Sequence, residues 1–256
     1  MMKKAGMNNL KRSCINYGML LSITIIFCII YRPLMNRGIY DHIGEKADWL
    51  TLLMDPMAAS GFTPFSAIFP ILPCAFLFCE EYNSGYIRMI LMRTGKWKYC
   101  IQRVLYTALS GGLAIFIPFL ILDIIIIFMG EPTTALNASP VWAGSIWGNY
   151  VLVGNGLFVM AAKLLLAFLF GCTWSLIALA VSTIITNRYA VIIIPFVLFQ
   201  LVWVALQNSI FNPLFLLRGD DRNFSSIGQV ILIEILYAIA AVIFFAIGFW
   251  RKMKNA

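Results

Sequence analysis

Charged residues are scarce in this chain. Only 12% of its 256 residues are Asp, Glu, Lys or Arg, whereas soluble domains carry about 25%. Hydrophobic residues make up 61% of the sequence, and the mean hydropathy is +0.87. This balance excludes an ordinary soluble domain and indicates a protein embedded in a membrane.

Residue types that bind metals are also few. The single histidine, His42, falls in a connection between apolar runs, where we expect a solvated loop residue. The six cysteines show no CxxC spacing and lie mostly inside or beside apolar runs, so they indicate neither a zinc site nor a disulfide framework. They are Cys14, Cys28, Cys74, Cys79, Cys100 and Cys172. We expect no metal and no cofactor.

Motifs for ATP hydrolysis and for intramembrane proteolysis are missing. A phosphate-binding loop needs GxxxxGK followed by Ser or Thr, but the one Gly-Lys pair, Gly95-Lys96, is followed by Trp97 and has Ile90 at the place of the first glycine. Glu80-Glu81 matches the start of an EExxxR protease motif, but Gly85 stands where the arginine belongs. The sequence therefore predicts that the chain is not an enzyme.

Apolar segments recur from end to end with short connections, and six of them approach the length of about 20 residues that a spanning helix needs. We therefore predict an all-α, polytopic membrane protein with one transmembrane domain over residues 1–256. In the second segment, Pro64, Pro70 and Pro73 should bend or break the helix. The segments are Asn16–Leu34, Gly61–Cys79, Val104–Met129, Gly156–Thr183, Ala190–Gln207 and Ile227–Trp250.

The net charge of the chain is +8. Its basic residues lie at the edges of the apolar segments, where Lys and Arg set the topology of a membrane protein. The positive charge therefore does not indicate nucleic-acid binding. With a cytoplasmic N-terminus, thirteen Lys and Arg fall on the cytoplasmic side and five outside. We therefore expect both termini in the cytoplasm. The cytoplasmic parts then include a basic segment, 1–15, and a loop, 80–103, while 209–226 form an outer loop.

Three ionisable residues, Asp123, Lys163 and Glu234, lie within the predicted spans. Each is about seven residues from the outer end of its span, which puts all three roughly 10 Å below the outer boundary. Lys163 could thus pair with Asp123 or Glu234. The residues could line an outward-facing substrate path or form a structural ion pair with a snorkelling lysine.

The sequence of the cytoplasmic loop predicts a short amphipathic helix over Glu80–Met92, which should stop at Thr94-Gly95. Tyr82, Tyr86, Met89 and Ile90 share one face at helical spacing. Such a helix could lie on the lipid surface or contact a cytosolic partner.

The run EEYNSGYI, residues 80–87, followed by RTGKWKY, residues 93–99, resembles the E-x-x-x-G-x-hydrophobic, turn, basic, Tyr pattern of ABC-2 type transporter permeases. Within that family it is most similar to peptide or lantibiotic exporters. The likeness extends to six spans, to the basic segment Lys3–Arg12 and to residues 212–217 before the last span. The pattern departs from the family at Arg103 and at Thr94-Gly95.

The resemblance implies a permease without its own ATPase, in which two membrane subunits, identical or different, sit on two cytosolic ATP-binding subunits. The cytoplasmic loop would be the coupling helix, seated in a groove of the ATPase, and 209–226 would form a re-entrant hairpin. The residues it assigns to the coupling contact are Glu81, Tyr82, Tyr86, Arg88, Met89, Ile90, Arg93 and Arg188.

The first functional hypothesis is therefore an exporter subunit in the plasma membrane. Apolar spans with few charges suit an amphipathic cargo, above all an antimicrobial or signalling peptide, with lipid or small-drug cargo also open. One alternative is a non-transporting scaffold or sensor that docks a cytosolic partner through the same loop. Another is an ion-coupled carrier that uses Asp123 and Glu234.

Overall fold

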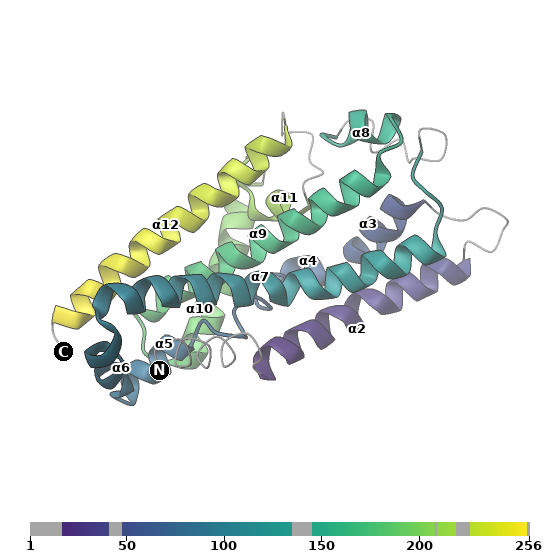
Figure 1. Cartoon of the computed structure of the whole chain (residues 1–256). Coiled ribbons are helices and arrows are strands. Elements are labelled where there is room, and N and C mark those ends of the chain that lie inside the picture. The colour runs from purple at the N-terminus through teal and green to yellow at the C-terminus, as the bar shows by residue number, and fades with distance from the viewer. Residues whose placement is uncertain (1–16, 41–47, 135–144, 208, 219–225, 255–256) are drawn as a thin grey trace.

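The computed structural model describes residues 17–40, 48–134, 145–207, 209–218 and 226–254 (Figure 1). The described chain is helical, with no strand and one isolated bridge between Asp48 and Glu131. Its helices are α2 (Tyr17–Tyr40), α3 (Trp49–Ala59), α4 (Phe62–Phe65), α5 (Leu77–Asn83), α6 (Tyr86–Thr94), α7 (Lys96–Met129), α8 (Gly148–Leu152), α9 (Gly156–Ser182), α10 (Arg188–Ala205), α11 (Pro213–Arg218) and α12 (Ile227–Lys254).

Five of these helices are long and apolar enough to cross a membrane: α2, α7, α9, α10 and α12. They lie lengthwise in one elongated bundle (Figure 1). Helix α9 packs against α7, α12 and α10 and is the most buried of the five, as expected for a helix without a polar face. The all-α, polytopic fold is thus confirmed.

Residues 61–79 do not form one continuous helix: the break predicted from the three prolines is confirmed, and the count of six spanning helices is not. Only Phe62–Phe65 is helical before a series of turns that ends at α5. Prolines at 64, 70 and 73 lack the backbone N–H that a helix needs as a donor. Side chains of neighbouring helices donate hydrogen bonds to carbonyls of this segment. Gln200 donates to the Pro64 carbonyl at 2.6 Å, and Ser22 donates to the Phe69 carbonyl at 3.0 Å.

Two other boundaries differ from the prediction. Helix α7 already begins at Lys96, so the last part of the predicted loop 80–103 is helical. The predicted outer hairpin over 209–226 is not confirmed, because its described part holds one short helix, α11, that packs against α9. Residues 219–225 lie outside the described part of the chain.

Helices α7 and α9 approach closely where both carry glycine. A Cβ atom on Gly171 would lie 2.5 Å from the Gly111 carbonyl oxygen and 3.0 Å from Gly112 Cα. Ser175 adds a hydrogen bond across the same crossing, from its hydroxyl to the Thr107 carbonyl at 3.0 Å. Small residues that let backbones meet are the usual basis of helix association in lipid.

The start of α3 is joined to the end of α7. The backbone N–H of Trp49 donates to the Glu131 carbonyl at 3.1 Å, and Thr133 Oγ1 donates to Asp48 Oδ2 at 3.0 Å. Asp48 also caps α3 by accepting from the Thr51 N–H at 3.3 Å. Because α5 lies toward the other end of the bundle (Figure 1), the broken segment from α3 to α5 runs along its length.

Candidate functional site

The predicted single helix over Glu80–Met92 consists of two short helices joined by a turn. Helix α5 ends at Asn83, and α6 begins at Tyr86 after Gly85, whose φ of 69° is a left-handed conformation that glycine adopts without strain. Gly95, with φ 78°, then ends α6 and leads directly into α7. The predicted stop at Thr94-Gly95 is confirmed.

An apolar cluster holds this pair of helices on the bundle. Phe78 of α5 and Ile87 of α6 are both buried there, against residues of α7, α9 and α12. Phe78 meets the rings of Phe245 and Phe249 edge-on, at centroid distances of 5.7 and 6.2 Å. The helix pair is therefore packed on the bundle rather than suspended from it.

Glu81 makes the strongest polar link from α5 to α7. Its Oε2 accepts a hydrogen bond from the Tyr99 hydroxyl at 2.5 Å, and its Oε1 lies 3.4 Å from Arg103 Nη1. The Arg103 side chain is only 8% exposed. Its Nε and Nη2 have no hydrogen-bond partner among the described residues. The sequence suggested Glu81 as a contact for a partner, but here its carboxylate faces inward.

Helix α5 also contacts the turn between α9 and α10. Asn83 Nδ2 donates to the Thr186 carbonyl at 2.8 Å, and Cys79 Sγ lies 3.2 Å from the Ile185 carbonyl oxygen. Arg188 Nη1 is 3.7 Å from Glu80 Oε1, but both side chains are about half exposed, and such pairs contribute little. The structure thus brings the predicted cytoplasmic loop 80–103 into contact with the turn that precedes Arg188, which was assigned to the same coupling contact.

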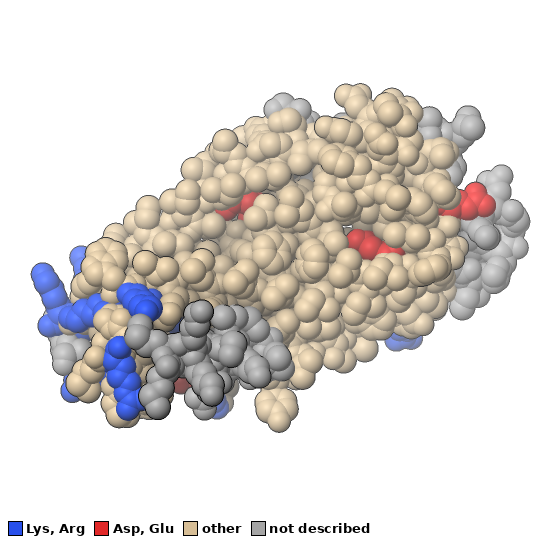
Figure 2. Space-filling model, in the orientation of Figure 1, with Lys and Arg blue, Asp and Glu red and all other residues tan. Residues whose placement is uncertain are grey.

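The free side of α6 and the start of α7 expose large apolar side chains. Tyr86 is 47% exposed, Met89 52%, Met92 80% and Trp97 68%. We call these four residues the α6 surface. Arg88, Arg93, Lys96 and Lys98, in the same segment of the chain, are also exposed. Figure 2 shows that Lys and Arg side chains gather at this end of the molecule.

Two of the predicted anchors are partly occupied within the chain. Ile90 packs against the apolar cluster. The Tyr82 ring stacks on Phe78 at 6.3 Å and lies 4.5 Å from Lys252 Nζ. Sequence reasoning missed Met92, at the end of the predicted helix, and Trp97, which lies in the first turn of α7.

The three intramembrane ionisable residues do not form one group. Asp123 and Lys163 line a cavity of about 20 Å³, enough for about one water molecule. Lys163 Nζ lies 3.5 Å from Met54 Sδ and 5.3 Å from the centroid of the buried Trp147 ring. Asp123 Oδ1 is buried without a hydrogen-bond partner among the described residues.

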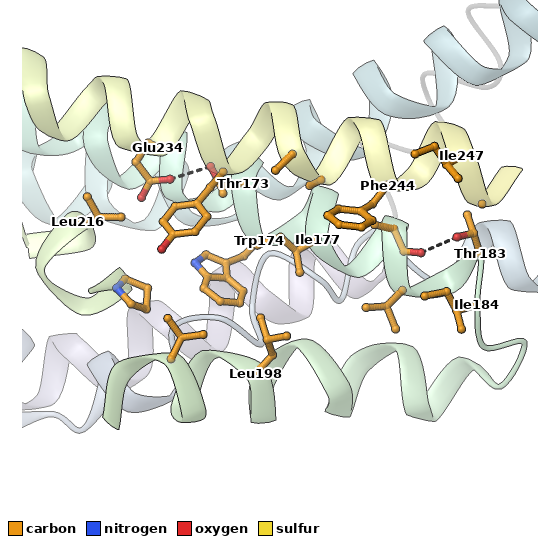
Figure 3. Close-up of a pocket in the computed structure, with 18 of the residues that line it drawn as sticks. Thr173, Trp174, Ile177, Thr183, Ile184, Leu198, Leu216, Glu234, Phe244 and Ile247 are labelled. Atoms are coloured by element: carbon orange, nitrogen blue, oxygen red, sulfur yellow. Dashed lines mark hydrogen bonds between the residues drawn. The ribbon is translucent and has the colours of Figure 1, made fainter. Parts of the chain in front are cut away.

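Glu234 lies elsewhere, in a groove of about 800 Å³ between α9, α10, α11 and α12. Its Oε2 accepts a hydrogen bond from Thr173 Oγ1 at 2.7 Å. Figure 3 shows Glu234 and Thr173 near one end, with Trp174, Ile177, Leu198 and Phe244 along the apolar walls. Arg251 and Lys252 also line the groove, and the three predicted residues therefore belong to two separate cavities.

No metal centre emerges from the described part of the chain, where no three His, Cys, Asp or Glu residues are grouped to hold an ion. Five of the six cysteines are described, and all five are free thiols. His42 and Cys14 lie outside the described residues.

Comparisons with protein-family models, with curated proteins and with solved structures find no match to this chain. The resemblance to ABC-2 type permeases therefore rests on the residues quoted for it.

Proposed function

We propose that this chain is the membrane subunit of an ATP-driven exporter. It would sit in the plasma membrane with both termini in the cytoplasm and form a pair with an identical or different permease. Cytosolic ATP-binding subunits would dock on the α6 surface and drive an amphipathic cargo, above all a peptide, across the bilayer. The observation that carries this proposal is a set of exposed apolar side chains, with exposed basic residues in the same segment, on helices packed against the spans.

The contacts below the α6 surface suit a mechanical link. Force on α6 would pass to the adjoining α5, and from α5 to α7 through Glu81, Tyr99 and Arg103. It would reach the α9–α10 turn through Asn83 and Cys79. A short helix in a groove of a partner is a common recognition mode, and rigid attachment lets the groove's movement displace the spans.

The proposed topology has six crossings, of which five are long helices. The broken segment from α3 to α5 would be the remaining one. Its start is bonded to residues just after α7, and its end packs against the first turn of α7 and the last turns of α12. The basic residues at the α6 end favour a cytoplasmic position for that end.

Copurification tests the docking surface. A tagged chain should retain a protein with Walker ATP-binding motifs, and Met89→Asp should weaken that complex by about 30-fold, because it places a charge in the centre of an apolar contact. Tyr86→Ala should act in the same direction. Val153→Asp is the matched control, since Val153 is 75% exposed just after α8, far from α6 in the sequence.

Transport then separates an exporter from a scaffold or sensor that uses the same surface. Inside-out vesicles with the wild-type complex should accumulate a labelled amphipathic peptide only when ATP is hydrolysed. If an ATPase copurifies but peptide, lipid and drug probes do not move with ATP, the scaffold function is favoured. Asp123 and Glu234 line different cavities, which gives no support to a carrier that uses both.

A further inference from the structure

The carboxyl group of Glu234 is enclosed in an apolar part of the molecule. The residue is 2% exposed, and within the described part of the chain no Lys or Arg forms an ion pair with it. Arg251 and Lys252 follow it by about 25 Å or more along α12. Its titratable neighbours are Cys172 of α9 and Tyr237 of α12, neither of which is a cation. The groove residues that α10 and α11 contribute carry no charge, and they are Leu198, Val202, Pro213 and Leu216. A buried carboxylate without a cation is costly, and such a group takes up a proton instead.

The surroundings of Thr173 point to the same protonation state. Its Oγ1 lies 2.7 Å from Glu234 Oε2 and 2.9 Å from the carbonyl oxygen of Leu169. A hydroxyl group has one proton, so with an ionised Glu234 that proton would have to serve two acceptors. A protonated Glu234 removes this conflict, because its O–H donates to Thr173 while the Thr173 hydroxyl donates to Leu169.

The second carboxyl oxygen of Glu234 is then an acceptor that a ligand could use. Among the described residues, Oε1 has no hydrogen-bond partner. Figure 3 shows one oxygen of Glu234 bonded to Thr173 and the other turned away from it, into the groove. The walls beyond are apolar and aromatic, including Trp174 and Phe244, and the groove volume of about 800 Å³ lies in the range of small-molecule sites.

We propose that Glu234 is held as a neutral carboxylic acid and that the groove binds an apolar molecule with an N–H or O–H donor. The donor bonds Glu234 Oε1, and the apolar body lies along α12 toward Phe244. Little water competes for a hydrogen bond in such surroundings, which strengthens it. The site is separate from the α6 surface, and the proposal does not depend on ATPase docking or on transport.

Dicyclohexylcarbodiimide tests the protonation state, because this apolar reagent reacts with carboxylic acids. The acid proton moves to a carbodiimide nitrogen while the carboxyl oxygen bonds to the central carbon, and the resulting O-acylisourea rearranges to a stable N-acylurea. The purified full chain is treated in phosphatidylcholine bilayers at neutral pH, and peptide mass spectrometry locates the adducts. Glu234 should be modified at least about tenfold more than the exposed Glu80 and Glu131, since exposed carboxyl groups are ionised at that pH.

Protection from this reagent measures ligand binding. Decanamide carries N–H donors, whereas N,N-dimethyldecanamide has the same acyl chain and none. Compared by concentration in the bilayer, decanamide should protect Glu234 at about fivefold lower levels, the effect of one hydrogen bond. Ala240→Phe should fill the groove and reduce the reaction, whereas Ala161→Phe, on an exposed face of α9 outside the groove, should not.

Three results would overturn the proposal. Modification of Glu234 no greater than that of Glu131 would mean that its carboxyl group is ionised or closed to ligands. Equal protection by the two amides would mean that no donor bonds Oε1. An unchanged reaction in Ala240→Phe would mean that the reagent reaches Glu234 by a path other than the groove. If Ala240→Phe does not fold, Ala240→Leu serves the same purpose.

Discussion

At the residue scale, two adjacent glutamates have different surroundings. Glu81 meets Tyr99 and Arg103, whose side chain is almost fully buried, whereas Glu80 faces an exposed Arg188 across 3.7 Å. A charge that loses its partner in a buried pair keeps its desolvation cost, while exposed pairs are screened by water. Neighbouring carboxylates should therefore differ in their contribution to stability.

We predict that Glu81→Ala lowers the free energy of unfolding by about 3 kcal/mol, because it leaves the Arg103 guanidinium buried without its carboxylate. Thermal unfolding of the purified chain in detergent measures the change. Glu80→Ala is the matched control and should cost less than about 1 kcal/mol.

Replacing both partners gives a second check on this pair. Glu81→Leu combined with Arg103→Met should cost less than Glu81→Ala alone, since no buried charge is left unpaired. Equal losses in Glu80→Ala and Glu81→Ala would contradict the assignment of Glu81 as the internal link.

At the scale of elements, the sequence predicted the features that depend on the length of apolar runs and on the positions of glycines. The five long helices follow from apolar runs, and the boundary at Gly95 follows from a stop signal. The broken segment over 61–79 could not be derived in detail, because its carbonyls are bonded by Gln200 and Ser22 from distant helices. For the same reason, the inward role of Glu81 depends on residues 18 and 22 positions away, and helical spacing gives no signal for it.

The crossing of α7 and α9 gives a prediction at this scale. Gly171→Ala should destabilise the chain by about 1–3 kcal/mol, as overpacking commonly does, because the new Cβ would collide with the backbone of Gly111 and Gly112. Gly228→Ala is the control. A Cβ atom at position 228 would meet Ser226 Oγ at 3.8 Å, which is an ordinary van der Waals contact.

That control should be neutral or stabilise α12 by up to about 1 kcal/mol, since alanine is the better helix former. Unfolding in detergent again measures both variants. A Gly171→Ala chain as stable as the wild type would mean that α7 and α9 do not cross with their backbones in contact.

At the scale of the whole molecule, the chain combines a bundle of long apolar helices with an end that carries the α6 surface. The bundle is built around α9, and the cavity at Asp123 and the groove at Glu234 are lined by different residues. The proposed docking end is the α6 surface, and its helices are attached to the bundle through Phe78, Ile87 and Glu81. Its exposed apolar residues would be removed from water by a protein partner or by a lipid surface.

Photo-crosslinking in intact cells from position 89 tests the central claim most directly, with position 153 as the control. A photoreactive residue in place of Met89 should form a protein adduct of defined mass. Mass spectrometry should identify its partner as an ATP-binding subunit with Walker motifs, and the same residue in place of Val153 should not capture that subunit. Adducts at position 89 with lipid alone, or with a protein that has no ATP site, would contradict the account.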